Sequence, residues 1–321
     1  MCKAAAVSTV LVTGGAGFIG SHLVDGLVAR GDRVVVVDNL SSGSVANLTA
    51  ALAAGATLHE LDVTDAAGLL ALAERERPEL VVHLAAQIDV RVSVADPARD
   101  ARINVEGTIN TLEAARVAGA QRLVLASTGG AIYGDAERIP TPESAPAHPV
   151  SPYGTSKLCG EAYLALYGRL HGLSTVALRF ANVYGPRQDA LGEAGVVAIF
   201  CAAALAGRPM GVFGDGSQTR DYVYVADVAA ALVAAASGTT AGAINIGTGR
   251  ETSVLELAAA IDVAAGRPPT PPEHHPARAG EVVRSCLDPA LAAQELGWTP
   301  EVMLDDGMAA TLAAMAGGPP G

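Results

Sequence analysis

Tyr153 and Lys157 are the residues of this sequence whose types and spacing most clearly indicate chemistry. Ser151 and Pro152 precede them as the N-cap and first-turn residues expected of a helix, so the two side chains would lie one turn apart on one helical face. A free tyrosine titrates near about 10, but an adjacent ammonium favours its phenolate. The pair predicts a tyrosine base that removes the proton of a substrate hydroxyl near neutral pH.

A second hydroxyl is expected close to this pair. Ser127 and Thr128 follow an apolar run that is typical of a strand. Thr128 could hydrogen-bond the same substrate hydroxyl and help the proton move, and Ser127 could share that role. The predicted catalytic residues are therefore Tyr153, Lys157, Thr128 and Ser127.

The glycines of residues 14–20 lie between an apolar, β-branched run and a helical pattern. In a strand–turn–helix of this kind Gly14 allows the tight bend, Gly17 lets the backbone approach a pyrophosphate, and Gly20 permits close helix packing. A second apolar run, 34–37, ends in Asp38, where a carboxylate accepts from both adenosine ribose hydroxyls and repels a 2′-phosphate. This context predicts bound NAD rather than NADP.

The elements that would position these residues alternate between strands and helices. Candidate strands are residues 7–13, 34–37, 57–61, 80–85, 122–127, 174–180 and 243–246, separated by helix-like segments. This alternation predicts an α/β fold with a Rossmann-like, doubly wound parallel sheet of about seven strands. It breaks down at 185–222 and after 249. We therefore expect an NAD-binding domain of residues 1–184 with a returning segment 223–249, and a smaller mixed α/β substrate lobe of 185–222 and 250–321.

Composition narrows the function classes. Half of the 321 residues are hydrophobic, 17% are charged, and the net charge is −12, which argues against a nucleic acid or an anionic membrane as partner. The four cysteines, Cys2, Cys159, Cys201 and Cys286, have no metal-type spacing, which predicts reduced thiols, no metal site and a cytoplasmic protein. No charged-then-apolar leader is seen, and the longest near-apolar stretch, 196–206, is too short to span a bilayer.

Several motifs together give a family resemblance. They are Thr-Gly-Gly-Ala-Gly-Phe-Ile-Gly (13–20), His-Leu-Ala-Ala (83–86), Asn-Val-Glu-Gly-Thr (104–108), Ala-Ile-Tyr-Gly (131–134), Tyr-Gly-Thr-Ser-Lys (153–157) and Leu-Arg-Phe-Ala-Asn-Val-Tyr-Gly-Pro (178–186). Over nearly its full length the chain resembles the extended short-chain dehydrogenase/reductases, the NAD-dependent epimerases and dehydratases, and within them the UDP-hexose 4-epimerases.

The resemblance implies an isomerase that keeps NAD bound while it interconverts UDP-glucose and UDP-galactose. Tyr153 would remove the proton of the sugar 4-hydroxyl as hydride leaves C4 for the nicotinamide. The 4-keto sugar would then rotate about its diphosphate linkage and take the hydride back on its other face. No net oxidation would occur.

The resemblance also assigns binding roles. The cofactor residues it implies are Gly14, Gly17, Phe18, Ile19, Gly20, Asp38, Asn39, Asp62, Val63, Leu84, Ala85, Ala86, Gln87, Asn104, Tyr153, Lys157 and Phe180. The substrate residues are Thr128, Asn182, Val197, Phe213, Arg220, Arg278, Glu281 and Ser285. Arg220 and Arg278 would clamp the diphosphate, because guanidinium groups bind phosphate through paired hydrogen bonds.

Residues 129 and 130 argue against two other reactions of this family, the dehydration and the decarboxylation of nucleotide sugars. Nucleotide-sugar dehydratases carry Asp-Glu directly after the threonine, and UDP-glucuronate decarboxylases generally keep a glutamate there, whereas this chain has Gly129-Gly130. UDP-glucuronate 4-epimerase stays open, with Arg91 or Arg187 as carboxylate partners, as do another nucleotide-sugar epimerase and a non-catalytic NAD-binding protein. In the family that this chain resembles, the residue at this position lies near the C2 substituent of the sugar, so the small Ser285 implies that N-acetylated UDP-hexoses also fit.

A homodimer is implied by the resemblance rather than by the residues. In the family the dimer pairs two helices, here 152–171 and 101–118. Leu158, Ala162, Ala165 and Leu166 form an apolar stripe along the first of these helices. The same stripe would serve equally well as intramolecular core.

Overall fold

A computed structural model describes residues 8–189, 195–277 and 282–317 of the chain. The chain forms two compact units. The first comprises Met1–Ser127, Ser151–Leu178 and Ala229–Ala243, and the second Thr128–Val150, Arg179–Val228 and Ile244–Gly321. Relative to the predicted domains, residues 128–150 and 179–184 fall in the second unit, and only 229–243 of the returning segment fall in the first. The cause is contact between distant segments: the Thr141 amide, for example, donates to the Cys286 carbonyl oxygen at 2.9 Å.

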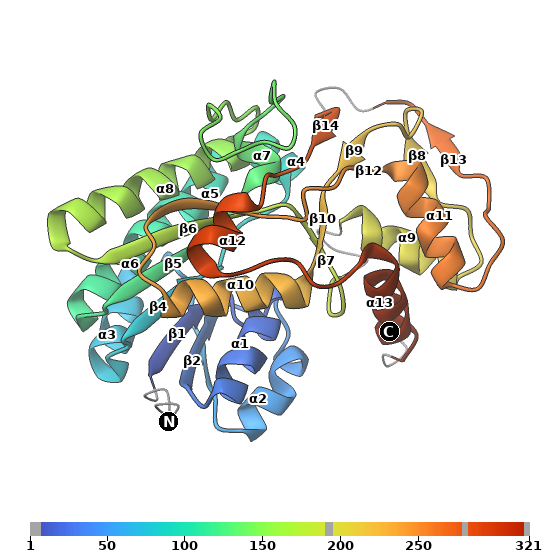
Figure 1. The fold of residues 1–321 in the computed structure, drawn as a ribbon. Helices are drawn as coiled ribbons and strands as arrows, with labels where there is room; N and C mark the ends of the chain where they lie inside the picture. Colours follow the sequence, from blue (N-terminus) through green and yellow to red (C-terminus); the bar gives the residue numbers. More distant parts are fainter. Residues whose placement is uncertain (1–7, 190–194, 278–281, 318–321) are drawn as a thin grey trace. The chain divides into compact units, whose positions relative to one another are not determined.

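The seven predicted strands form one sheet in the order β11-β6-β5-β4-β1-β2-β3. Figure 1 labels β6, β5, β4, β1 and β2 of this sheet. Their bounds are β1 Thr9–Thr13, β2 Arg33–Asp38, β3 Thr57–Glu60, β4 Leu80–His83, β5 Arg122–Thr128, β6 Ser174–Phe180 and β11 Gly242–Ile246. The pairings β1–β2, β1–β4, β2–β3 and β4–β5 are parallel. The fold class predicted from the sequence is confirmed.

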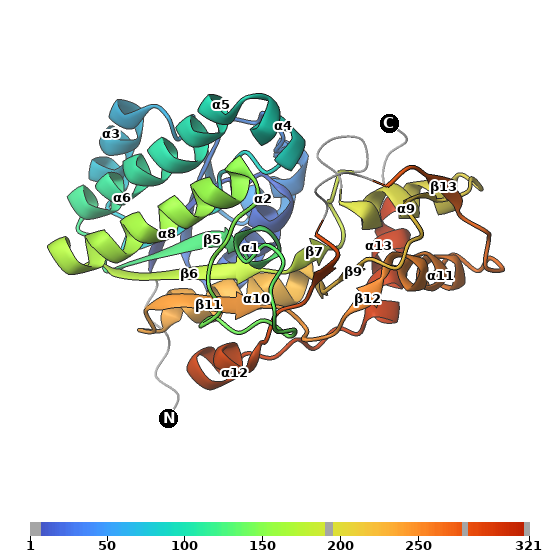
Figure 2. The same cartoon turned by 90° about the horizontal axis from the view of Figure 1, so that it is seen from above.

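Helices cover both faces of this sheet, and its central strands β1, β2 and β4 are accordingly apolar runs rather than alternating ones. On one face α3 (Ala66–Glu76), α6 (Gly107–Ala118) and α8 (Pro152–His171) pack over a core that includes Leu11, Leu112 and Leu164 (Figure 2). On the other face lies α1 (Phe18–Arg30), where Gly26 approaches Val233 of α10 (Val225–Ser237). The first unit also contains five short helical elements. They are η1 Val45–Leu48, α2 Thr49–Ala53, α4 Val90–Ala95, α5 Pro97–Ala101 and the π-helical turn η2 Arg102–Glu106.

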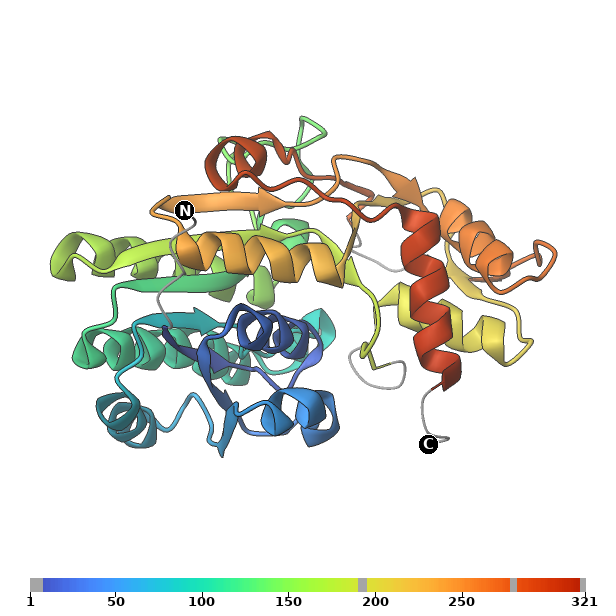
Figure 3. The same ribbon diagram turned by 60° about the horizontal axis from the view of Figure 1, so that its bottom comes forward.

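The second unit is built around three helices. These are α9 (Val196–Leu205), α11 (Val254–Ala264) and α13 (Leu304–Gly317), drawn yellow, orange and red in Figure 3, and they share a core that includes Phe200, Ile261 and Leu312. Short strands pair as β10–β7, β12–β9–β14 and β13–β8. Their bounds, with those of the two short helices, are β7 Asn182–Tyr184, β8 Gly211–Phe213, β9 Thr219–Arg220, β10 Tyr222–Tyr224, β12 Thr252–Ser253, β13 Glu273–His275, β14 Arg284–Ser285, α7 Gly129–Ile132 and α12 Ala290–Leu296. In the parts of the chain that the structure describes, every helix is too short or too polar to cross a membrane.

Candidate active site

The turn after β1 requires its glycines. Gly14 adopts a left-handed conformation with φ of 70°, and a Cβ built on it would lie 2.6 Å from the Ala85 amide nitrogen. A Cβ on Gly20 would collide with the carbonyl oxygen of Gly14. Helix α1 then begins at Phe18 with Gly17 as its N-cap and without a side-chain cap. Amide groups of its first turn are thus available to an anion, as the glycine spacing predicts.

Asp38 ends β2 beside this turn and is 7% exposed. Its Oδ2 accepts a hydrogen bond from the Ala16 amide, and its Oδ1 accepts one from the Leu40 amide, both at 2.9 Å. Asn39 donates to Asp62 Oδ2 at 2.7 Å, which brings these two predicted cofactor residues together. The fixed carboxylate, the glycine turn and the uncapped helix fit the adenosine ribose and the diphosphate of a dinucleotide.

The segment after β4 lies directly against the glycine turn. The Leu84 amide donates to the Thr13 carbonyl oxygen at 3.0 Å, and the Ala85 amide donates to Thr13 Oγ1 at 3.3 Å. Asn104 fixes the next residues, because its side chain exchanges two 2.9 Å hydrogen bonds with the Gln87 backbone. Leu84 and Ala85 therefore border the glycine turn, and Asn104 fixes the backbone two residues further along the same segment.

Helix α8 carries the Tyr–Lys pair in the predicted way. Ser151 Oγ accepts from the Gly154 amide at 3.1 Å, and Pro152 occupies the first turn. Tyr153 is half-buried, whereas Lys157 is 5% exposed and donates from Nζ to the Ala126 carbonyl oxygen of β5 at 3.1 Å. The lysine is thus held against the carboxyl end of a central strand.

Burial sets the charge state of the groups around Lys157. Desolvation lowers the pKa of Lys157 to about 8, and the negative charges of Asp100 and Glu161 oppose this change. Desolvation, reinforced by the positive charge of Lys157, lowers the pKa of His83 to about 3. At neutral pH Lys157 is therefore mostly an ammonium and His83 is neutral.

The buried His83 ring connects three elements near Lys157 by hydrogen bonds. Its Nδ1 lies 2.7 Å from Thr13 Oγ1 and its Nε2 lies 3.1 Å from Thr108 Oγ1. The ring joins the ends of β1 and β4 to α6. It supplies hydrogen bonds without adding a second positive charge near Lys157.

The two candidate hydroxyls at the end of β5 differ in their partners. Ser127 Oγ donates to Glu161 Oε1 of α8 at 2.6 Å, so the Ser127 hydroxyl proton is already used in a hydrogen bond within the protein. Thr128, the last residue of the strand, is the N-cap of α7, but its side chain makes no capping hydrogen bond. A Cβ built on Gly130 would lie 4.0 Å from Thr128 Oγ1 and 3.7 Å from Asn182 Oδ1, which places these two predicted substrate residues together in the second unit. The geometry favours Thr128 over Ser127 as the assisting hydroxyl.

Arg220 and Ser285 are brought together in the second unit as register partners of β9 and β14. The neighbouring Asp221, 1% exposed, accepts from Thr248 Oγ1 at 2.6 Å and from the Leu287 amide at 3.2 Å. Burial raises the pKa of the Asp221 carboxyl. Asp221 therefore anchors the segments that carry Arg220 and Ser285. Asp221 follows Arg220 in the sequence Thr-Arg-Asp-Tyr (219–222). The sequence predicts a role for Arg220 but none for Asp221.

The remaining predicted residues are placed as follows. Phe213 ends β8 with its ring centroid 5.2 Å from that of His275. Val63 and Val197 are buried in the cores of the first and second units, so their side chains give no support to the predicted ligand contacts. Phe180 ends β6 within the second unit, and it too is buried. Arg278 and Glu281 lie outside the described residues.

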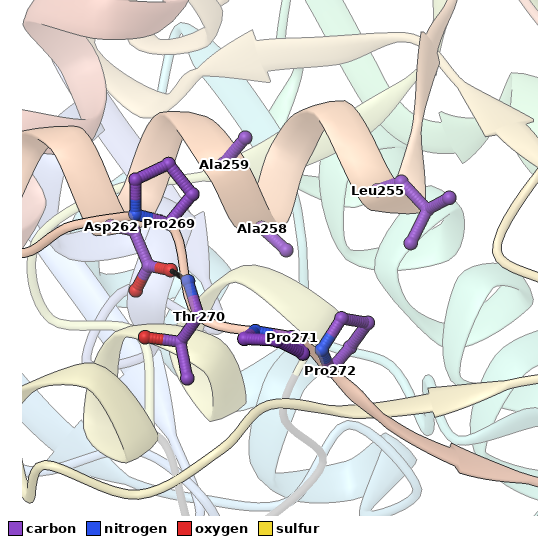
Figure 4. A pocket seen from close by; sticks show the side chains of 8 residues that line it. All are labelled: Leu255, Ala258, Ala259, Asp262, Pro269, Thr270, Pro271 and Pro272. Atoms are coloured by element: carbon purple, nitrogen blue, oxygen red, sulfur yellow. Dashed lines mark hydrogen bonds between the residues drawn. The ribbon is translucent and has the colours of Figure 1, made fainter.

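A cavity of about 330 Å³ in the second unit contains none of the predicted residues. It is lined by α11 and by the proline-rich segment after it, where the Thr270 amide donates to Asp262 Oδ2 (Figure 4). Its lining side chains are Leu255, Ala258, Ala259, Asp262, Pro269, Thr270, Pro271 and Pro272.

Comparison with known proteins finds that the chain is similar to several UDP-glucose 4-epimerases. It is 50% identical to UDP-glucose 4-epimerase of Mycolicibacterium smegmatis over 94% of this chain and 96% of that protein. Its fold matches UDP-glucose 4-epimerase of Thermotoga maritima with UDP-glucose at a TM-score of 0.93, with 46% identity over 96% of this chain and 98% of the other.

It also matches UDP-glucose 4-epimerase of Thermus thermophilus in complex with NAD, at a TM-score of 0.89 and 44% identity over 96% and 99% of the two chains. The profile of the NAD dependent epimerase/dehydratase family covers residues 10–247, which include the glycine turn and the Tyr–Lys pair. The chain belongs to the NAD dependent epimerase/dehydratase family.

Proposed function

We propose that this protein is a UDP-glucose 4-epimerase, an isomerase that interconverts UDP-glucose and UDP-galactose and keeps its NAD bound through turnover. The observation that carries the proposal is Tyr153 on the same helix as a buried, mostly protonated Lys157, in the unit that holds the glycine turn and Asp38. Similarity to UDP-glucose 4-epimerases over 94% of the chain supports it.

The proton chemistry is assigned to α8 and the end of β5. Tyr153 removes the proton of the sugar 4-hydroxyl and later returns it, and the Lys157 ammonium favours the phenolate form that this requires. Thr128 hydrogen-bonds the same hydroxyl. When bound, NAD supplies the site that accepts hydride from C4 and gives it back, so that only the configuration at C4 changes.

Substrate binding is assigned to the second unit. Arg220 and Arg278 bind the diphosphate, Phe213 lies by the uracil, and Glu281 binds the uridine ribose. Asn182, which shares the surroundings of Gly130 with Thr128, lies by the phosphate region. These guanidinium groups supply local positive charge on a chain with a net charge of −12.

The predicted apolar stripe of α8 supports a homodimer. Ala162 and Ala165 are exposed and Leu158 and Leu166 are half-buried, so much of the stripe faces outward rather than into the core. Nearby Leu170 of α8 is 65% exposed and Val117 of α6 is 38% exposed. We propose that α6 and α8 pair with the same helices of a second copy. The cysteines that the structure describes, Cys159, Cys201 and Cys286, are free thiols, which supports a reducing, cytoplasmic setting.

The decisive experiment supplies the purified protein with UDP-glucose and no external NAD, and separates the nucleotide sugars by chromatography. Formation of UDP-galactose is the expected result and would also establish that NAD is retained. Absence of product both without and with added NAD would reject the proposal. UDP-glucuronate in the same assay would then test the uronate 4-epimerase alternative.

A further inference from the structure

Asp100 is a buried carboxylate to which the proposed chemistry assigns no role. It lies in α5, near α8, and is 1% exposed. Oδ1 accepts from Gln87 Nε2 at 3.0 Å and from Asn104 Nδ2 at 3.1 Å. Oδ2 is buried and has no hydrogen-bond partner among the described residues. A buried anionic oxygen without a donor is costly unless an opposite charge compensates it.

The compensating charge is on Lys157. Lys157 is buried as well, and Asp100 is the larger of the two negative influences that act on it, ahead of Glu161. The negative charge of Asp100 therefore opposes the desolvation of the buried Lys157 ammonium.

A chain of hydrogen bonds also joins Asp100 to the first turn of α8. Asn104 Nδ2, which donates to Asp100 Oδ1, lies 3.1 Å from Ser156 Oγ and donates to it. Ser156 Oγ donates in turn to the Tyr153 carbonyl oxygen at 2.9 Å. The carboxylate is thus connected to the backbone of the predicted base and to the residue that precedes Lys157.

The other titratable side chains on the elements around Lys157 are uncharged, paired with an opposite charge or exposed to solvent. His83 of β4 is neutral at pH 7. Arg91 of α4 pairs with Asp89 at 2.7 Å, and Arg102 and Glu106 of η2 face each other at 3.9 Å with side chains 71% and 51% exposed. On α6, Glu113 pairs with Arg116, and Asp96 and Arg99 beside Asp100 are exposed. Among the described residues, Asp100 and Glu161 are the acidic groups whose charges act on Lys157.

We propose that Asp100 is a positioning residue for the Tyr–Lys pair. Its carboxylate, assisted by Glu161, keeps the Lys157 side chain an ammonium inside the protein, and its link through Asn104 and Ser156 holds the first turn of α8. The consequence of this charge for turnover rests on the proposed function. The charge of Lys157 itself is measurable without turnover.

The chain offers a direct measurement because it contains two lysines, Lys3 and Lys157. Protein labelled with ¹³C at lysine Cε gives two lysine signals, which a Lys3→Arg variant assigns. Following the Lys157 signal against pH gives its pKa in the intact protein, and the ellipticity of the same samples reports folding. The pH dependence of 4-epimerisation is recorded in parallel.

Asp100→Asn is the principal variant, since it removes the charge and keeps the shape and the Oδ1 acceptor. We expect it to lower the pKa of Lys157 by about one pH unit and to move the alkaline limb of the activity profile down by the same amount. Glu161→Gln should move both in the same direction by less. Glu106→Gln, which removes an exposed charge from the adjoining turn, is the matched control and should move neither.

An unchanged Lys157 pKa in folded Asp100→Asn overturns the proposal. If that variant does not fold, Glu161→Gln decides: a lowered pKa supports the carboxylate pair, and an unchanged one overturns it. A lowered pKa in a protein whose wild type has no epimerase activity supports the charge relation and rejects the proposed function. A lowered pKa with an unmoved activity profile rejects the role of Asp100 in turnover.

Discussion

At the scale of single residues, the proposed chemistry rests first on the phenol of Tyr153. Replacing Tyr153 with phenylalanine removes the base and retains the ring, so turnover should fall by about 100-fold or more while NAD stays bound. Initial rates of UDP-galactose formation and the ratio of absorbance at 260 and 280 nm check both parts. A variant with wild-type rates would remove Tyr153 from the mechanism.

The ammonium of Lys157 predicts how activity depends on pH. Burial lowers the pKa of this lysine to about 8, so the protonated form predominates below pH 8 and is lost as the pH rises through that value. Because the ammonium favours the phenolate of Tyr153, kcat/KM should decline above pH 8. Rates measured from pH 6 to 10 at constant ionic strength provide the test. A constant rate up to pH 10 would show that turnover does not need the charge.

Ser285 predicts substrate breadth. Ser285 is the register partner of Arg220. We propose that this strand pair contacts the UDP-sugar, where a small side chain would leave room for an N-acetyl group at C2. Ser285→Tyr should reduce activity toward UDP-GlcNAc at least about tenfold more than activity toward UDP-glucose. The two activities are measured side by side, with Ser285→Ala as the control that should preserve their ratio. An unchanged ratio in the tyrosine variant would contradict the role.

At the scale of the elements, the packing of α1 against the glycine turn gives a stability prediction. A Cβ on Gly20 meets the backbone carbonyl of Gly14, which cannot move without distorting the turn. Gly20→Ala should therefore lower the free energy of unfolding by about 1–3 kcal/mol and release NAD. Gly26→Ala on the same helix meets its nearest atom, in Val233, at 3.7 Å and should be neutral or slightly stabilising. Thermal melts and retained NAD of the two variants give the comparison.

The elements also show what a sequence can and cannot reveal. The residue types alone predict strand 174–180 to the residue and the helix start at Ser151 and Pro152, because these features are local. They do not predict the burial of Asp100, since its short helix reads as a polar surface segment. Its environment depends on Gln87, Asn104 and Lys157, which come from other elements. The unit boundaries escape prediction for the same reason: Tyr133 joins the second unit through a 2.9 Å hydrogen bond to Asn245.

At the scale of the whole molecule, the outward stripe on α8 predicts assembly. Ala162→Arg places a long charged side chain in the proposed contact between two copies and should convert a dimer to a monomer. Sedimentation at micromolar concentration measures the change. Ala310→Arg, at an exposed position of α13, is the matched control and should remain dimeric. A wild-type protein that sediments as a monomer would reject the homodimer.

The order in which the chain is made bears differently on the two units. Every segment of the first unit is present by residue 243, whereas the core of the second joins Phe200 and Ile261 to Leu312 near the C-terminus. During synthesis at about 5–20 residues per second, the first unit can fold on the ribosome while the second waits for its last helix to emerge. Until then the apolar faces of α9 and α11 lack α13. A nascent chain stalled before residue 304 should therefore bind chaperones and resist proteolysis only in its first unit.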